Sequence, residues 1–324
     1  MAEKERFLWH LRRIMKKNPL IYKIYHTLNN FLYWKIRVRI NTFIYKNFVK
    51  FPSDGLNTSE KRAEKIIVSL TSYPARIDSV PYAILSMLRQ TIKPDKIILW
   101  LGTGKFPDDK LPEIFDRVKA SGVDIEFRED LGPHTKYFYA VQEYPDDIVI
   151  TVDDDHIYDR NLIERLYKSY KNHPGCVQAL TVSRITFDSN GNMNKYVDWE
   201  HAYAGNPGSS SHEYIAFGIG GVLYPPHSLP PETFNLEAMK RLSPRNDDIW
   251  LKFMEIMNGT KVTVAASSTQ LAGSYIYGCS AEFALRNTND RQGENQIQLD
   301  AILNEYPALA DIIRKDSGVI KVAQ

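Results

Sequence analysis

The sequence predicts an α/β protein built on a largely parallel β-sheet, and two observations support this fold class. First, between residues 65 and 152 β-branched apolar runs alternate with amphipathic segments, as in strands separated by helices. Second, one of these runs ends abruptly in three adjacent carboxylates, Asp153, Asp154 and Asp155. Open α/β sheets bind ligands just beyond the carboxyl ends of their strands. The chain of 324 residues, 43% hydrophobic and 25% charged, is long enough for a sizeable core and is not typical of a disordered protein.

The elements follow in a regular order up to the acidic triplet. Strands are expected at 66–70, 96–101, 123–127 and 147–152, and helices at 80–90, 111–121, 137–143 and 161–172. The rhythm then changes. Residues 176–187 and 195–199 read as strands around the turn at 188–191, and the small-residue loop 204–211 is either a surface connection or a lid. Further helices are expected from residue 247 and over 298–306.

The charges divide the chain unequally. Residues 1–50 contain 12 Lys and Arg against 2 Asp and Glu, whereas the remainder contains 29 basic and 37 acidic residues. The basic part is rich in aromatic residues, has no apolar run near the ~18 residues needed to span a bilayer, and lacks a signal-peptide cleavage site. We therefore expect residues 1–51 to form amphipathic helices on a membrane surface.

Other interpretations of this arm remain open. Its helices could pack on the domain or on a second subunit, so an oligomer is possible, and its aromatic residues could stack on nucleic acid bases, although no recognition motif accompanies them. Residues 52–64 read as a linker to a domain that begins near residue 65. Cys176 and Cys279 provide neither a disulfide framework nor a metal motif, which favours a reducing compartment such as the cytoplasm.

The acidic triplet predicts a divalent cation, because adjacent carboxylates repel one another and Mg²⁺ and Mn²⁺ prefer oxygen ligands. We expect Asp155 to bind the metal directly and Asp153 to bind either the metal or another part of the ligand. Asp154 should point away, since adjacent strand residues face opposite sides. His156, His201 or His212 could supply a third ligand. The alternative is a solvated acidic loop.

A second acidic pair, Asp247 and Asp248, stands where an amphipathic helix begins. One of the two could act as a general base, or both could simply interact with the helix dipole. Periodicity puts Asp247 on the apolar face with Trp250. Two softer candidates follow the third expected strand: Asp130 could accept a hydrogen bond from a ligand and Lys136 could contact an anionic group, or both could be surface charges.

Together these motifs resemble the GT-A-fold glycosyltransferases, most closely the bacterial family 2-like enzymes. The resemblance covers about residues 65–275 and rests on four features: the strand end 69–76, the Asp-x-Asp motif of Asp153 and Asp155, the glycine-rich run 217–224, and the acidic pair in 246–251. It implies a nucleotide half over 65–155, an acceptor half over 156–275, and a C-terminal tail over 276–324 in which Arg286 or Arg291 could close over donor phosphates.

The resemblance also implies roles for individual residues. The donor nucleotide would be contacted by Thr71, Tyr73, Arg76 and Asp154, and also by Asp130 at a base edge, Lys136 at a phosphate and Asp153 at the ribose. The acceptor pocket would be lined by Gly220, Gly221 and Trp250. Asp248 would be the base of an inverting transfer, with Asp247 beside it. The implied activity is metal-dependent transfer of a sugar, most commonly from a UDP-sugar, to a glycan or lipid-linked acceptor in surface polysaccharide or lipopolysaccharide synthesis.

Three rival functions remain open. A nucleotidyltransferase would need a glycine-rich loop after the first strand, where this chain has residues 71–76 without a glycine. A phosphatase with a nucleophilic aspartate would need Asp-x-Asp-x-Thr on its first strand, but Ile157 stands at the threonine position. A membrane-bound module without catalytic activity would have no need of the retained acids.

Overall fold

The structure is a computed structural model that describes residues 36, 38–107, 110–203, 205–265, 272–278 and 293–318. The chain divides into two compact units. In the first, the described part consists of α3 (Val38–Asn47), the residues next to it and 275–277. The second runs from 50 to 274 and resumes at 278. The predictions for residues 1–35, Arg286 and Arg291 lie outside the described residues.

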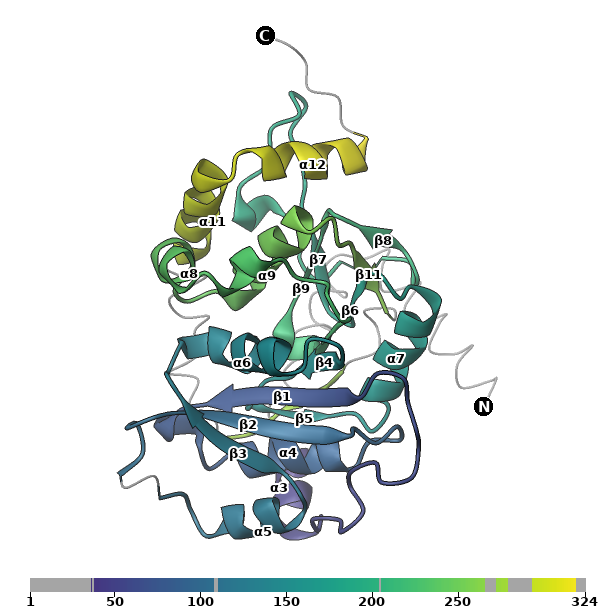
Figure 1. Ribbon diagram of the computed structural model, residues 1–324, viewed down its shortest axis with the longest axis vertical. Helices are drawn as coiled ribbons and strands as arrows, with labels where there is room; N and C mark the ends of the chain where they lie inside the picture. The colour runs from purple at the N-terminus through teal and green to yellow at the C-terminus, as the bar shows by residue number, and fades with distance from the viewer. Residues whose placement is uncertain are drawn as a thin grey trace. The chain divides into compact units, whose positions relative to one another are not determined.

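An eight-stranded sheet forms the centre of the second unit, in the order β3-β2-β1-β4-β10-β6-β11-β8 (Figure 1). Its strands are β1 (Ile66–Ser72), β2 (Lys96–Gly102), β3 (Asp124–Arg128), β4 (Ile148–Thr151), β6 (Val177–Ala179), β8 (Ser210–Ser211), β10 (Val222–Tyr224) and β11 (Val262–Val264). The pairs β1–β2, β1–β4, β2–β3 and β6–β11 are parallel, whereas β10 is antiparallel to β4 and β6, and β8 to β11. The predicted α/β class with a mixed, mostly parallel sheet is confirmed.

Two short sheets complete the strands. β5 (His156–Tyr158) pairs with β12 (Gly273–Tyr275), and β7 (Val182–Arg184) pairs with β9 (Tyr214–Ala216). The strand predicted at 195–199 is wrong, because this segment forms the 3₁₀ helix η5 (Tyr196–Asp198). Tyr196 and Trp199 are both buried while Val197 is exposed, and a three-residue spacing places side chains on one side of a 3₁₀ helix.

Helices cover both faces of the sheet because the central strands are apolar on both sides. Along β1, Ile66, Val68 and Leu70 share a core with α4 and α5, whereas Ile67 packs with Ala140 of α6 on the opposite face (Figure 1). The helices of this unit are α4 (Val80–Leu88), α5 (Ile114–Ala120), α6 (Thr135–Glu143), α7 (Leu162–Asn172), α8 (Leu236–Leu242), α9 (Asp247–Met257), α11 (Glu294–Glu305) and α12 (Ala308–Ser317).

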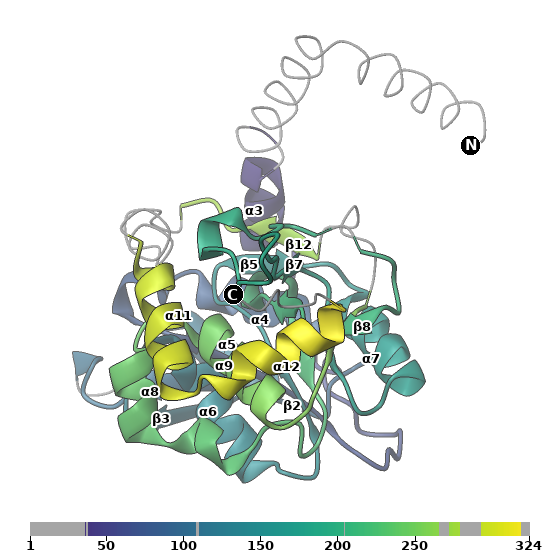
Figure 2. The same ribbon diagram turned by 90° about the horizontal axis from the view of Figure 1, so that it is seen from above.

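The C-terminal helices belong to the same core as α9. Leu299 and Ile302 of α11, with Leu309 and Ile313 of α12, are buried in the cluster that contains Trp250, and Figure 2 shows α11 and α12 beside α8 and α9. The segment predicted as a linker, 52–64, is tied to this unit by a 2.9 Å ion pair between Arg62 and Asp95. Within the described part of the chain, no helix has the length and apolar character needed to cross a membrane.

Candidate active site

Five carboxylates gather beyond the carboxyl end of β4, and we call them the acid cluster: Asp153, Asp154, Asp155, Asp247 and Asp248. Strand register explains the gathering. Thr151, near the end of β4, is paired with Ser69 of β1 and with Val222, the first residue of antiparallel β10. The segment that leaves β4 and the segment that enters β10 therefore meet at one edge of the sheet, which is the edge where α/β proteins place their ligands.

Arg76 holds two acids of the cluster. It follows β1 on the short helix η2 (Pro74–Arg76), and its Nη1 lies 3.0 Å from Oδ1 of Asp154 and 3.0 Å from Oδ2 of Asp155. The Ser72 hydroxyl donates to the other oxygen of Asp154 at 2.5 Å. Burial and the charge of Asp155 raise the pKa of Asp154 to about 6, although Arg76 opposes this. The two ion pairs tie the end of β1 to the loop after β4.

These contacts correct one prediction. Asp154 does not point away, because its side chain is buried and its two oxygens bind Ser72 and Arg76; a nucleotide contact by Asp154 stays a prediction. The guanidinium group of Arg76 is enclosed between the acids. Its position after the strand was predictable, but its partners depend on the path of the chain between β4 and β5.

His156 is the partner of Asp155. Its Nδ1 lies 2.6 Å from Oδ1 of Asp155, and both side chains are largely buried. Burial by itself would raise the pKa of Asp155, but the hydrogen bond from His156 and the charges of His156, Arg76 and Lys136 outweigh it and lower the pKa. Asp155 is therefore held in its ionised form more firmly than Asp154, whose pKa is raised.

Lys136 bridges the two acidic motifs. Its Nζ lies 3.0 Å from Oδ1 of Asp153 and 2.9 Å from Oδ2 of Asp247, and only 9% of its side chain is exposed. Burial would lower its pKa, but the three acids Asp153, Asp247 and Asp248 raise it well above the ordinary lysine value. Lys136 is thus a permanent buried cation rather than a surface charge.

The start of α6 is rigidly placed, which fixes Lys136. The buried imidazole of His134 donates through Nε2 to the carbonyl of Ser243 at 2.6 Å, and its Nδ1 lies 3.0 Å from the Tyr137 hydroxyl. Burial lowers the pKa of His134, which keeps the ring neutral. Ser243 precedes α9 by a few residues, so this hydrogen bond connects the beginning of α6 to the beginning of the helix that carries Asp247 and Asp248.

Asp248 is not the cap of its helix. Asn246 is the N-cap residue of α9, and its side chain accepts from the backbone N–H of Ile249 at 2.9 Å. Asp248 instead accepts a hydrogen bond from the backbone N–H of Gly218 at 3.2 Å. Burial and the adjacent Asp247 raise the pKa of Asp248 well above that of an ordinary aspartate. The pair therefore does more than interact with the helix dipole.

Gly218, which sequence reasoning missed, is the glycine that adjoins the acid cluster. It opens η6 (Gly218–Gly220), and a Cβ added there would lie 2.7 Å from Nζ of Lys136 and 3.1 Å from Oδ1 of Asp153. Gly220 and Gly221, the predicted pocket residues, are buried, and a Cβ at either would meet Thr181 or Leu162. A pocket role for Gly220 and Gly221 stays a prediction.

Two further site predictions are corrected by burial and topology. The Trp250 side chain is 0% exposed and its Nε1–H donates to the carbonyl of Thr233 at 3.1 Å, so it belongs to the core rather than to an acceptor pocket. His212 follows β8, which is four strands from β4 and hence about 19 Å away at the usual strand spacing. Its charged neighbours are Lys252, Asp316 and Lys261.

The remaining predicted contacts surround the strand ends. His201 is occupied by the Tyr196 carbonyl and the Ser183 hydroxyl, which leaves it unsuited to a metal. The half-buried Thr71 donates to the carbonyl of Trp100, and the ring of Tyr73 lies 5.7 Å from the Arg76 guanidinium carbon. Asp130 is exposed, pairs with Lys105 and accepts from the backbone of Gly132. A nucleotide contact by Thr71, Tyr73 or Asp130 stays a prediction.

The acid cluster fits a divalent cation that a ligand helps to bind. Within the described ranges, no three His, Cys, Asp or Glu side chains are arranged to hold a metal by themselves. Five carboxylates nevertheless exceed the charges of Lys136 and Arg76, and Oδ2 of Asp153 has no hydrogen bond or ion pair among the described residues. Mg²⁺ is commonly bound by one or two carboxylates together with substrate phosphates. Asp153 and Asp155 suit this arrangement.

Comparisons with known proteins give limited similarity. No protein-family model matches the chain, and no curated protein matches it. Glucosyl-3-phosphoglycerate synthase from Mycobacterium tuberculosis, in complex with Mn²⁺, UDP and phosphoglyceric acid, is 18% identical with a TM-score of 0.29, over 36% of this chain and 42% of that chain. The same enzyme with Mg²⁺ and UDP is 17% identical with a TM-score of 0.29, over 40% and 50%. The chain thus spans about half of these structures or less, and similarity at this level assigns neither a family nor an activity.

Proposed function

We propose that the protein is a metal-dependent glycosyltransferase that moves a sugar from a nucleotide-sugar donor, with a UDP-sugar as the first candidate, to a hydroxyl of the acceptor. The observation that carries the proposal is the convergence of two acidic motifs, about ninety residues apart in sequence, on the single buried cation Lys136. A phosphate-binding metal site and a candidate base would thereby share one edge of the sheet.

Each side of the acid cluster has a role in this proposal. Asp153 and Asp155 would hold Mn²⁺ or Mg²⁺ against the donor diphosphate, and the cation would offset the negative charge of the departing nucleotide. Arg76 and His156 keep Asp155 ionised and oriented. Lys136 keeps Asp153 near the second acidic motif without occupying its Oδ2.

Asp248 is the proposed base for inversion. Its carboxylate is oriented by the N–H of Gly218, and burial with the charge of Asp247 raises its pKa toward the range in which a base accepts a proton efficiently. It would take the proton of the acceptor hydroxyl as that oxygen attacks the anomeric carbon. Asp247, paired with Lys136, positions its neighbour.

We also propose a location and an acceptor class. The basic, aromatic-rich residues 1–50 would hold the enzyme peripherally on the inner, cytoplasmic face of a membrane, since anionic lipids attract such segments. An acceptor that is a lipid-linked or membrane-proximal glycan, as in surface polysaccharide or lipopolysaccharide synthesis, follows from this location. Nucleic acid is not expected as a partner.

The test is product analysis with a panel of nucleotide sugars in the presence of Mn²⁺. Release of a nucleoside diphosphate that stops with EDTA and returns with Mn²⁺ supports the proposal, whereas pyrophosphate release from a nucleoside triphosphate supports a nucleotidyltransferase. Asp248→Asn should abolish transfer while retaining donor binding. Full activity of Asp155→Ala, or no turnover of any donor by a folded protein, would refute the assignment.

A further inference from the structure

The first unit contains an exposed apolar stripe on α3. Ile36, Ile40, Phe43, Ile44 and Phe48 recur at helical spacing, and their exposed fractions lie between 42% and 69%. Val38 and Thr42 on the same helix are buried instead. An amphipathic helix of a soluble domain normally buries its apolar side. A helix that exposes such a stripe marks an interaction surface.

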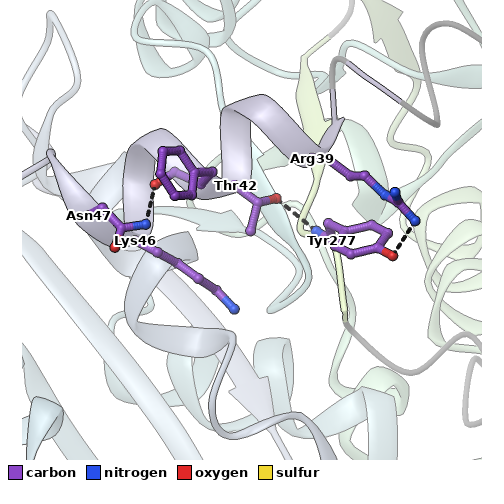
Figure 3. A pocket seen from close by; sticks show the side chains of 6 residues that line it. Arg39, Thr42, Lys46, Asn47 and Tyr277 are labelled. Carbon is purple, nitrogen blue, oxygen red and sulfur yellow. Dashed lines mark hydrogen bonds between the residues drawn. The ribbon is translucent and has the colours of Figure 1, made fainter.

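A cationic pocket lies along this helix, wholly within the first unit. Its volume is about 380 Å³, and it is lined by Tyr277 and by five residues of α3, namely Arg39, Thr42, Phe43, Lys46 and Asn47 (Figure 3). Arg39 and Lys46 are the charged side chains in the lining, and neither the lining nor α3 itself contains an acidic residue.

Tyr277 organises the pocket although it is 238 positions from Arg39. The guanidinium carbon of Arg39 lies 4.4 Å from the centroid of the Tyr277 ring, and Nη2 of Arg39 donates to the Tyr277 hydroxyl at 2.5 Å. The backbone N–H of Tyr277 donates to Oγ1 of Thr42 at 2.8 Å, as Figure 3 shows. An arginine held on an aromatic ring is preordered for an anion, since less side-chain freedom is lost on binding.

We infer that this pocket binds the anionic headgroup of a membrane lipid while the apolar stripe of α3 enters the lipid interface. The combination carries the inference: exposed Ile and Phe side chains match acyl chains, and the two cations that line one pocket, Arg39 and Lys46, match an anionic lipid surface. A second copy of the chain is a poorer occupant, because neither α3 nor the pocket lining has an acidic residue that could pair with the Arg39 and Lys46 of another copy.

The inference deepens the proposed membrane location and is tested separately from catalysis. Flotation of the full chain is measured with vesicles of phosphatidylcholine alone and of phosphatidylcholine mixed with phosphatidylglycerol. We expect binding only to the mixed vesicles. The double variant Arg39→Gln/Lys46→Gln should bind at least tenfold more weakly, because each cation near an anionic surface contributes about 1 kcal/mol. Phe43→Ser should also weaken binding, since it removes an apolar side chain from the stripe.

Matched controls distinguish lipid binding at this pocket from a general effect of surface charge and from the proposed catalytic activity. Lys168→Gln removes another exposed lysine, on α7, and should float as the wild type does. Donor hydrolysis in solution should be unchanged in Arg39→Gln/Lys46→Gln. A wild-type protein that binds vesicles but turns over no donor would refute the proposed catalytic function and leave the lipid-binding inference intact. Equal flotation of this variant and the wild type would overturn the inference. So would binding to inorganic phosphate without vesicle binding, or a dimer that dissociates in Phe43→Ser while vesicles remain unbound.

Discussion

Replacing Lys136 by Met removes the cation that joins the two acidic motifs while nearly preserving side-chain volume. Two carboxylates then lose a partner at 3.0 and 2.9 Å. Breaking a buried ion pair from one side costs about 3–5 kcal/mol. Because the Asp153 side chain is 28% exposed and partly solvated, we expect the lower end, about 3 kcal/mol. This corresponds to a fall in Tm of roughly 6–12 °C for a domain of this size.

The assay is thermal and urea unfolding at several pH values, with Lys105→Met as the matched control. Lys105 pairs with Asp130 at 3.3 Å, but its side chain is 55% exposed, so its loss should change stability by less than about 1 kcal/mol. A neutral carboxyl group needs no cation beside it, so the loss of stability in Lys136→Met should shrink as the pH falls through the aspartate range. Equal Tm values for the two variants, or a loss that does not depend on pH, would refute the reasoning.

Three other variants test separate parts of the structure. Gly218→Ala should lower the steady-state turnover rate roughly tenfold or more, because the added Cβ displaces Lys136 and Asp153. Gly175→Ala is the control, since an added Cβ there meets nothing within 4 Å and turnover should equal that of the wild type. Equal rates for the two variants would contradict the site geometry. Burial raises the pKa of Glu255 to about 7, so its contribution to stability is complete below the unfolded value of 4.5 and is lost as the pH rises through 7, by about 3 kcal/mol. The double variant Lys252→Met/Glu255→Met should remove this dependence of stability on pH. It should also be at least as stable as the wild type near neutral pH, because apolar side chains replace a buried ion pair. Urea unfolding measures the free energy of unfolding at each pH, and a variant that keeps the wild-type change with pH would contradict this prediction. Trp250→Phe should lose about 1–2 kcal/mol with its hydrogen bond to Thr233 yet keep KM unchanged, and a raised KM would instead return Trp250 to the acceptor pocket.

Most of the parallel part of the sheet could be predicted from sequence. The segments 66–70, 96–101 and 147–152 became β1, β2 and β4, since burial on both faces leaves an apolar run that needs no partner to be recognised, and 123–127 overlaps the less buried β3. The elements after residue 155 were harder to predict. β5, β7 and β9 each have three residues, which is too short for a period to be recognised. Residues 195–199 contain β-prone side chains, but the buried ones, Tyr196 and Trp199, are spaced three residues apart as in a 3₁₀ helix.

The site was predictable as a set of motifs and not as a set of contacts. Asp153, Asp155 and Asp247 could be selected because carboxylates at the ends of strands and at the start of helices are typical of metal and catalytic sites. Lys136 could be selected because its segment follows a predicted strand. Which acid faces which cation depends on register between segments that are distant in sequence, so the partnership of Arg76 with Asp154 was not visible. Trp250 and His212 were misplaced because a residue type alone does not reveal whether the side chain is enclosed in the core or lies on a distant strand.

The central claim is that the acid cluster binds a divalent cation together with a nucleoside diphosphate. Calorimetric titration of UDP into the full chain, with Mn²⁺ and with EDTA, tests it most directly in the wild type and in Asp153→Asn and Asp155→Asn. We predict that Mn²⁺ strengthens UDP binding at least tenfold in the wild type, which corresponds to about 1.4 kcal/mol, and that both variants lose this gain. UDP binding that is equally strong with EDTA, or unchanged in both variants, would contradict the account.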